Sequence, residues 1–211
     1  MSRLILNEVA APSTPATAKV AIYASSDANP ILRMKDDAGN DKPLAGINNF
    51  SVTSQALTAA TRTYIAGSAI AIPAVKLKIG TILKWKINIT KTAAGVAAST
   101  IDIAFGTLGT TGDTARVSFT KPAGTAAVDE GMITIIAIVR GPLSASGVVT
   151  GHMTVTHNLA ATGHMTIPAA DVQVQSAGFD VTTPTFVGIC ITTGTADVIT
   201  IQLVTADAIN L

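Results

Sequence analysis

The amino-acid sequence predicts an all-β protein, in which an extended N-terminal arm with a short β-hairpin precedes an antiparallel sandwich or barrel of about eight strands. Apolar and polar residues alternate strictly from Leu83 to Thr90, as in a strand with one face in a core. Clusters of turn-forming residues separate the later apolar runs at short spacing. No segment shows the 3.6-residue period typical of an amphipathic helix. Together these features favour β-structure throughout.

The arm is predicted over residues 1–46, with strands at 19–24 and 31–35 and turns at 25–30 and 36–40. A proline-containing stretch precedes the first of these strands. Two short strands with so little apolar surface are marginal alone. We therefore expect the arm to pack against copies of itself or against a host surface. Residues 47–60 are small and polar and are predicted to form a linker.

The segment from Leu83 to Thr90 is the clearest strand of the domain predicted over residues 61–211. Its odd-numbered positions form the expected core face: Leu83, Trp85, Ile87 and Ile89. Trp85, the only tryptophan, is thus predicted to anchor the core. Lys84 and Lys86 lie on the opposite face. Two interpretations remain open for this pair: a positive strip for an anionic partner such as acidic polysaccharide, or lysines on a solvent-facing or edge strand.

The other strands of the domain follow from apolar runs bounded by Gly, Pro, Thr and Asp. The predicted ranges are 62–72, 81–91, 100–107, 115–120, 131–141, 147–157, 185–193 and 197–206. Residues 132–139 and 198–204 are apolar at nearly every position, which is typical of strands buried on both faces. We expect at least one outer face to pack against another subunit. The alternative is that Ala and Thr dilute a solvent-facing surface.

The composition also predicts assembly. Hydrophobic residues make up 48% of the chain and charged residues 13%, with a formal net charge of +1. A protein with so little charge has little electrostatic protection against association. The same neutrality disfavours nucleic acid as a partner. The apolar run near Met1 is too short for a signal peptide, so none is expected. No apolar stretch is long enough to span a membrane, so membrane insertion is not expected either.

No arrangement of residues predicts a catalytic, cofactor or metal site. The histidines lack the close ligand spacing typical of zinc sites, although a symmetric oligomer could gather three copies of one of them. Asp129 and Glu130 are adjacent, so they either face opposite sides of a strand or occupy a turn before Gly131. Cys190 has no partner for an intrachain disulfide and is predicted to be a buried apolar residue. We therefore expect a non-enzymatic protein without a cofactor.

The N-terminal arm resembles the opening of many tailed-bacteriophage virion proteins. The residues that carry the resemblance are Leu6–Glu8, Ala11–Pro15, Lys19–Tyr23 and Leu32–Asn40. In that group, a proline-containing turn leads to a strand and a hairpin that attach a fibre, spike or decoration protein to the particle. Arg116–Phe119 and Val139–Ser144 are also similar to small phage appendage proteins. The hairpin of this chain has an insertion at 27–30, so head and tail attachment both remain open.

The resemblance implies a structural virion protein, homotrimeric, with a C-terminal eight-strand jelly roll. It is expected to reside in the virion and to bind other capsid or tail proteins through the arm. The expected anchoring residues are Val20, Ile22, Tyr23, Leu32 and Met34. The alternative is a tail-fibre or spike tip whose Lys84 and Lys86 face binds host-surface glycan, for which exposed aromatic side chains are expected. A depolymerising enzyme would need two convergent carboxylates.

Overall fold

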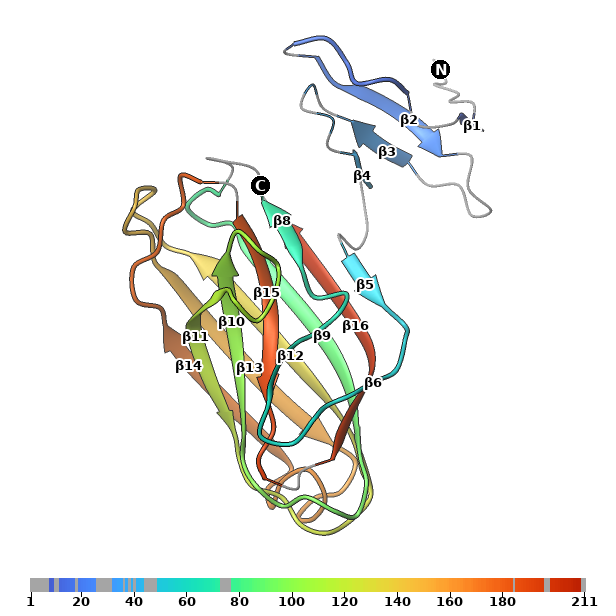
Figure 1. The fold of residues 1–211 in the computed structure, drawn as a ribbon, viewed down its shortest axis with the longest axis vertical. Coiled ribbons are helices and arrows are strands. Elements are labelled where there is room, and N and C mark those ends of the chain that lie inside the picture. The colour runs from blue at the N-terminus through green and yellow to red at the C-terminus, as the bar shows by residue number, and fades with distance from the viewer. Residues whose placement is uncertain are drawn as a thin grey trace, which may run out of the picture. The chain divides into compact units, whose positions relative to one another are not determined.

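The computed structural model describes residues 8–9, 12–17, 19–25, 32–35, 37, 39, 41–43, 49–72, 77–183, 185–195 and 198–209 (Figure 1). The chain divides into two compact units, Met1–Asn48 and Asn49–Leu211. Every regular element of the described residues is a β-strand, which confirms the predicted all-β class. No helix in this part of the chain has the length and apolar character needed to span a membrane.

The smaller unit is a four-stranded sheet whose strands follow one another in chain order. These strands are β1 (Glu8–Val9), β2 (Ala21–Ser25), β3 (Leu32–Lys35) and β4 (Asp41–Pro43). The pair β2 and β3 is the predicted hairpin, with Ile22 opposite Met34 and Tyr23 opposite Arg33. The Lys35 ammonium group donates a hydrogen bond to the Pro12 carbonyl at 2.8 Å, so the proline-containing stretch is tied to this hairpin.

The larger unit is a β-sandwich of a five-stranded and a seven-stranded sheet (Figure 1). The strands of the five-stranded sheet are β7 (Arg62–Tyr64), β8 (Ile70–Ile72), β10 (Ser99–Gly106), β11 (Thr114–Lys121) and β15 (Thr185–Thr192). The strands of the seven-stranded sheet are β5 (Asn49–Ser51), β6 (Gln55–Ala56), β9 (Ile82–Lys91), β12 (Asp129–Val139), β13 (Val149–His157), β14 (Ala169–Gln175) and β16 (Ile199–Ile209).

The strand order is β11-β10-β15-β7 in the five-stranded sheet, with β8 also paired to β15. In the seven-stranded sheet it is β14-β13-β12-β9-β16-β5, with β6 also paired to β16. All strand pairs within these two sheets are antiparallel. The chain passes from one sheet to the other between β6 and β7, β8 and β9, β9 and β10, β11 and β12, β14 and β15, and β15 and β16.

The predicted count of eight strands is too low for the larger unit. The range 62–72 is not one strand, because Gly67 has a φ of +83° and turns the chain between β7 and β8. Residues 47–60 are not a simple linker, since β5 and β6 pair with β16. The strand β14 was also missed. All of these are short strands or strands at a sheet edge, where the apolar pattern is weakest.

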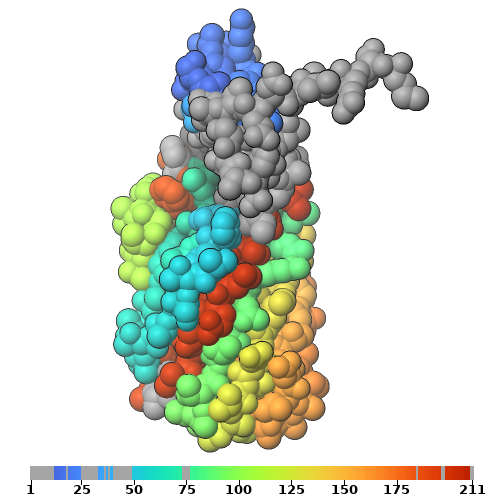
Figure 2. Space-filling model, turned by 90° about the vertical axis from the view of Figure 1, so that its right-hand side faces the viewer, coloured from blue at the N-terminus to red at the C-terminus, as the bar shows by residue number. Residues whose placement is uncertain are grey.

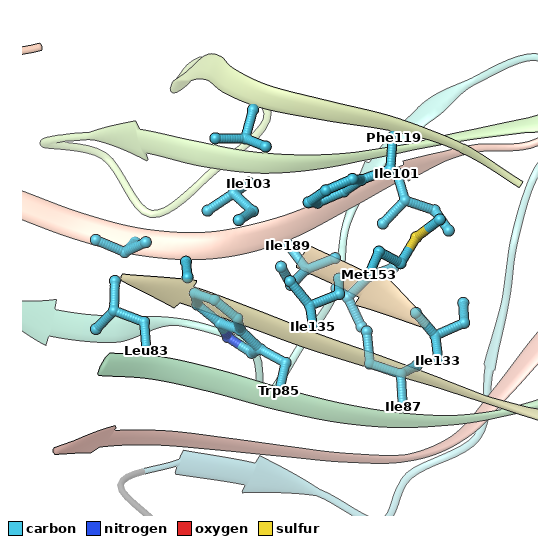
Figure 3. Close-up of a cluster of buried hydrophobic side chains, with 14 of the residues drawn as sticks. Leu83, Trp85, Ile87, Ile101, Ile103, Phe119, Ile133, Ile135, Met153 and Ile189 are labelled. Carbon is cyan, nitrogen blue, oxygen red and sulfur yellow. The ribbon is translucent and has the colours of Figure 1, made fainter. Parts of the chain in front are cut away.

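The core lies between the two sheets and is centred on Trp85 (Figure 3). The predicted core face of β9 is confirmed, because Leu83, Trp85, Ile87 and Ile89 are all fully buried. The indole nitrogen of Trp85 donates a hydrogen bond to the Ser68 carbonyl at 2.8 Å. Apolar side chains of both sheets surround it; those labelled in the figure are Ile101, Ile103 and Phe119 from β10 and β11, Ile133, Ile135 and Met153 from β12 and β13, and Ile189 from β15.

Candidate functional site

The hairpin of the smaller unit exposes apolar side chains on one of its faces. Val20 and Ile22 are 55% and 52% exposed, although both are aliphatic. Met34, which lies directly opposite Ile22, is partly buried. Exposed apolar residues placed next to one another are a common feature of surfaces that bind another protein.

The five predicted anchoring residues do not share one face of the hairpin. Tyr23 is buried and, as the neighbour of Ile22 in the strand, lies on the opposite face of β2. For Leu32 the structure describes only the backbone, which pairs with Ala24. The exposed part of the predicted set is therefore Val20 and Ile22, while Tyr23 stabilises the hairpin that presents them.

The second predicted surface is the outer face of the seven-stranded sheet, the face directed away from the core. Figure 2 looks onto this sheet, where β16, β9, β12 and β13 lie side by side as diagonal strips. Four apolar side chains on this face are 40–55% exposed. They are Met132 and Ile138 from β12, and Leu203 and Ile209 from β16. Within a single chain the outer face of β12 is thus partly exposed, and its packing against another subunit stays a prediction.

Lys84 and Lys86 lie in the middle of this outer face. Lys84 is flanked by Ile136 on β12 and Asp207 on β16, and it is half-buried. Lys86 is exposed between two threonines. Because β9 lies between β12 and β16, the two lysines are not on an edge strand, so the edge part of that interpretation is wrong. The solvent-facing part agrees with the exposure of Lys86.

The lysine strip does not extend beyond this pair. Gly80 has a φ of +85° in the turn before β9, so the chain bends between Lys78 and Lys84. Lys76, the other lysine of the same parity, is outside the described residues. One exposed aromatic residue shares the face, because Phe50 on β5 pairs with Thr205, which in turn pairs with Lys86.

A buried polar group that the sequence did not predict lies on the outer face of the five-stranded sheet. Asp102 accepts hydrogen bonds from the Arg62 guanidinium at 3.0 Å and from the Ser118 hydroxyl at 2.6 Å. Arg62 also donates to the carbonyls of Thr111 and Asp113 in the loop after β10. Nε and Nη1 of Arg62 thus join the sheet to this loop, while the buried Nη2 atom has no hydrogen-bond partner among the described residues.

Cys190 lies beside Asp102 in this sheet, and its predicted burial is confirmed. Burial raises the pKa of its thiol to about 11, so the thiolate is scarce at neutral pH. Tyr64, the neighbour of Cys190 on β7, covers the backbone of Gly188, where an added Cβ would lie less than 2.5 Å from the tyrosine hydroxyl. These residues therefore have a packing role.

A second buried polar cluster lies where β9, β11 and β13 end and β12 begins. We call it the histidine cluster, and its members are Lys91, Lys121, Asp129, His157 and His164. Asp129 accepts hydrogen bonds from the His157 ring at 2.6 Å and from the His164 amide at 2.9 Å. The other ring nitrogen of His157 is 2.7 Å from the Ile167 carbonyl, so both ring nitrogens lie within hydrogen-bond distance of an oxygen atom.

The two lysines of the histidine cluster donate to backbone carbonyls. The Lys91 ammonium group bonds the Thr125 carbonyl at 2.6 Å, and the Lys121 ammonium group bonds the His164 carbonyl at 2.8 Å. One sequence signal could have revealed this cluster. Lys91, Lys121 and Asp129 each continue the core-facing positions of their strands, so alternation alone directs them inward.

Hydrogen bonds set the charge state of Asp129. Burial alone would raise the pKa of its carboxyl group. Hydrogen bonds from the His164 amide, the His157 ring and the Glu130 amide outweigh burial and hold this pKa below its usual value. Asp129 is therefore a carboxylate at neutral pH, paired with His157.

His157 and Asp129 have the geometry of an acid–base dyad, but a substrate could not reach them. Both side chains are fully buried, and both ring nitrogens of His157 already have partners. A general base must reach a proton of the substrate, and neither group does so in this arrangement. Among the described residues no group of three or more His, Cys, Asp or Glu side chains is placed to hold a metal ion.

Comparisons with known proteins do not place the chain in a family. No family model matches it, and no curated protein matches it. A solved structure of fructofuranosidase from Schwanniomyces occidentalis, complexed with fructose, shares 12% sequence identity with a TM-score of 0.25. The match covers 91% of this chain and 40% of that chain, so the chain spans less than half of its length. A likeness this weak carries no argument about function.

Proposed function

We propose that this chain is a structural, non-enzymatic virion protein of a tailed bacteriophage. The N-terminal unit attaches it to capsid or tail proteins, and the sandwich is displayed on the particle as part of a homotrimer. The resemblance of the arm to phage attachment segments motivates the proposal. The observation that carries it is the hairpin of the smaller unit, a separate compact unit with exposed Val20 and Ile22.

In this proposal the sandwich forms the trimer interface through the outer face of its seven-stranded sheet. This outer face combines exposed aliphatic side chains with Lys84, Lys86 and Asp207 near its centre. Burial of apolar surface stabilises association by about 25 cal/mol per Å². The repeated passage of the chain between the two sheets supports a jelly-roll type of sandwich. The hairpin of β10 and β11 and the consecutive strands β12, β13 and β14, each within one sheet, are additions to that scheme.

Removal of residues 1–46 should leave a folded sandwich that no longer joins particles. The sandwich keeps its whole core, because every buried core residue of the main cluster lies after residue 49. Particles are purified from cells that express either the full chain or the truncated chain, and each preparation is probed with an antibody against the sandwich. Copurification of the truncated chain would contradict an anchoring role for the arm.

Charge on the outer face should dissociate the oligomer without unfolding the chain. The wild-type protein is expected to have three times the 21.4 kDa chain mass in light scattering at micromolar concentration. Ile138→Glu combined with Leu203→Glu should reduce the mass to that of one chain, because both carboxylates would enter the buried interface. Val96→Glu combined with Leu108→Glu is the matched control, since both residues are exposed in loops. A monomeric wild-type protein would rule out the trimer.

A second candidate is recognition of host-surface glycan by the same outer face. The observation that favours it is Phe50, an exposed aromatic residue in the cross-strand row that contains Lys86. Aromatic faces commonly stack on sugars, while lysines bind acidic groups. A glycan array with the full chain tests this candidate, and binding that is lost in Phe50→Ala supports it. The absence of any bound glycan would count against it.

A further inference from the structure

Two loops meet at the end of the sandwich that contains the histidine cluster. They are residues 122–128 between β11 and β12, and residues 158–168 between β13 and β14; we call them the end loops. The Thr125 amide donates to the Gly163 carbonyl at 2.9 Å, and the Gly163 amide donates to the Thr125 hydroxyl at 2.8 Å. Gly124 allows this close approach, because an added Cβ would lie 2.1 Å from the Gly163 carbonyl oxygen.

The His164 side chain is packed beneath this junction without a hydrogen-bond partner. It is fully buried, and neither ring nitrogen has a partner among the described residues. Its ring lies edge-on to the His157 ring, with 6.5 Å between centroids. A neutral imidazole tolerates such a site at a modest desolvation cost, whereas a charged one does not.

The groups that face His164 make its protonation unfavourable. They come from four strands: Lys91 on β9, Lys121 on β11, Asp129 on β12 and His157 on β13. Asp129 is the only anion among them, and its Oδ2 atom already accepts from the His157 ring and the His164 amide. A protonated His164 would thus be a further buried cation, and neither of its ring nitrogens has an acceptor within hydrogen-bond distance among the described residues.

We propose that the histidine cluster is an acid-sensitive latch, which holds the end loops together at neutral pH and releases them when a proton from solvent binds the His164 ring. Release removes the desolvation and charge repulsion by exposing the ring to water. Loss of the Thr125 and Gly163 hydrogen bonds accompanies it. Met165 is the core residue that the end loops contribute, and the strands of the sandwich remain paired, because the end loops lie outside them. This latch does not depend on the proposed virion function.

The direction of the pH effect follows from the burial of His164. Burial and the nearby Lys121 lower the pKa of His164 from 6.5 to about 4. The open form therefore binds the proton more readily than the closed form, and the latch is complete above pH 6.5 and lost progressively as the pH falls toward 4. Between pH 7 and 4.5 the opening equilibrium should rise on the order of 50-fold.

Hydrogen exchange of the full-length protein at pH 7 and 4.5 tests the latch, with rates corrected for the intrinsic pH dependence of exchange. Protection of the peptides that cover 122–128 and 158–168 should fall on the order of 50-fold at the lower pH. Protection of the 107–113 loop at the other end of the sandwich should change little. This comparison within the wild-type protein shows whether the pH effect is confined to the end loops. An equal loss of protection at both ends of the sandwich would overturn the proposal.

Variants at His164 and His152 test whether protonation of His164 causes the pH effect on the end loops. His164→Met replaces the ring by an apolar side chain and should abolish the pH effect on the end loops, because it leaves no group to protonate at this position. His152→Gln is the matched control, since His152 is exposed on β13, and it should retain the full effect. An unchanged pH response in His164→Met would overturn the latch. If that variant does not fold, the pH titration of the His164 ring is followed by NMR in the wild-type protein instead. A His164 ring that titrates near pH 6.5 would contradict the latch.

Discussion

Replacement of Trp85 by alanine should lower the free energy of unfolding by about 3–5 kcal/mol. The side chain is fully buried between the two sheets, and its removal leaves a cavity that β9, β12 and β15 can close only in part. The variant also leaves the Ser68 carbonyl without the indole donor. Urea unfolding followed by far-UV circular dichroism measures the loss, because the variant has no tryptophan for fluorescence.

Two further variants separate the contributions at Trp85. Trp85→Phe retains much of the apolar volume and should cost roughly half as much as the alanine variant. Val96→Ala, at an exposed loop position, should change the stability by less than about 0.5 kcal/mol. A Trp85→Ala variant as stable as Val96→Ala would show that Trp85 is not the centre of the core.

Alternation was sufficient to predict which residues of β9 face the core. Leu83 and Trp85 repeat at a spacing of two, and the opposite face carries lysines, so only one orientation buries the apolar set. The position of β9 within its sheet could not be predicted in the same way. Its neighbours, β12 and β16, are separated from it by long stretches of chain, and alternation contains no information about which strands pair.

The missed strands have a common physical reason. Gln55–Ala56 and Asn49–Ser51 are short and mostly polar, and they become strands because β16 offers them unpaired backbone groups. Ala169–Gln175 alternates correctly, but its inward residues are small and it lies at the edge of the sheet. In such segments the hydrogen bonds of a neighbour decide the structure, and local sequence contributes little.

The sequence alone predicts more about the two proposed surfaces than about the histidine cluster. Alternation predicts that Lys84 and Lys86 share a face, but it does not predict their cross-strand neighbours, which belong to β12 and β16. The histidine cluster joins residues from the ends of four strands. Inward parity could have marked Lys91 and Asp129 as buried, but their convergence with His164 depends on loop packing.

Replacement of Asp129 by asparagine should also lower the free energy of unfolding by about 3–5 kcal/mol, because it leaves the buried His157 ring without its charged partner. The His157 ring and the His164 amide both donate to the same carboxylate oxygen. In the asparagine variant, an NH2 group at that position could not accept either hydrogen bond, because it is itself a donor. The Asp171→Asn variant is the matched control. The His152 and Asp171 pair has the same chemistry at 2.7 Å, but its side chains are 43% and 66% exposed. Its loss should cost less than about 1 kcal/mol.

The pH dependence of stability distinguishes the buried carboxylate from a purely steric effect of the substitution. Because the pKa of Asp129 is held below its usual 3.8 in the folded chain, its contribution is complete above that value and lost as the pH falls further. The wild-type protein should therefore lose stability steeply below pH 4, and Asp129→Asn should lose less over that range. Urea unfolding of both variants and the wild type at pH 7 and at pH 3 provides the comparison. Equal costs for Asp129→Asn and Asp171→Asn at pH 7 would show that burial does not strengthen the pair. A wild-type slope retained in Asp129→Asn would assign the acid sensitivity to other titratable groups, His164 among them.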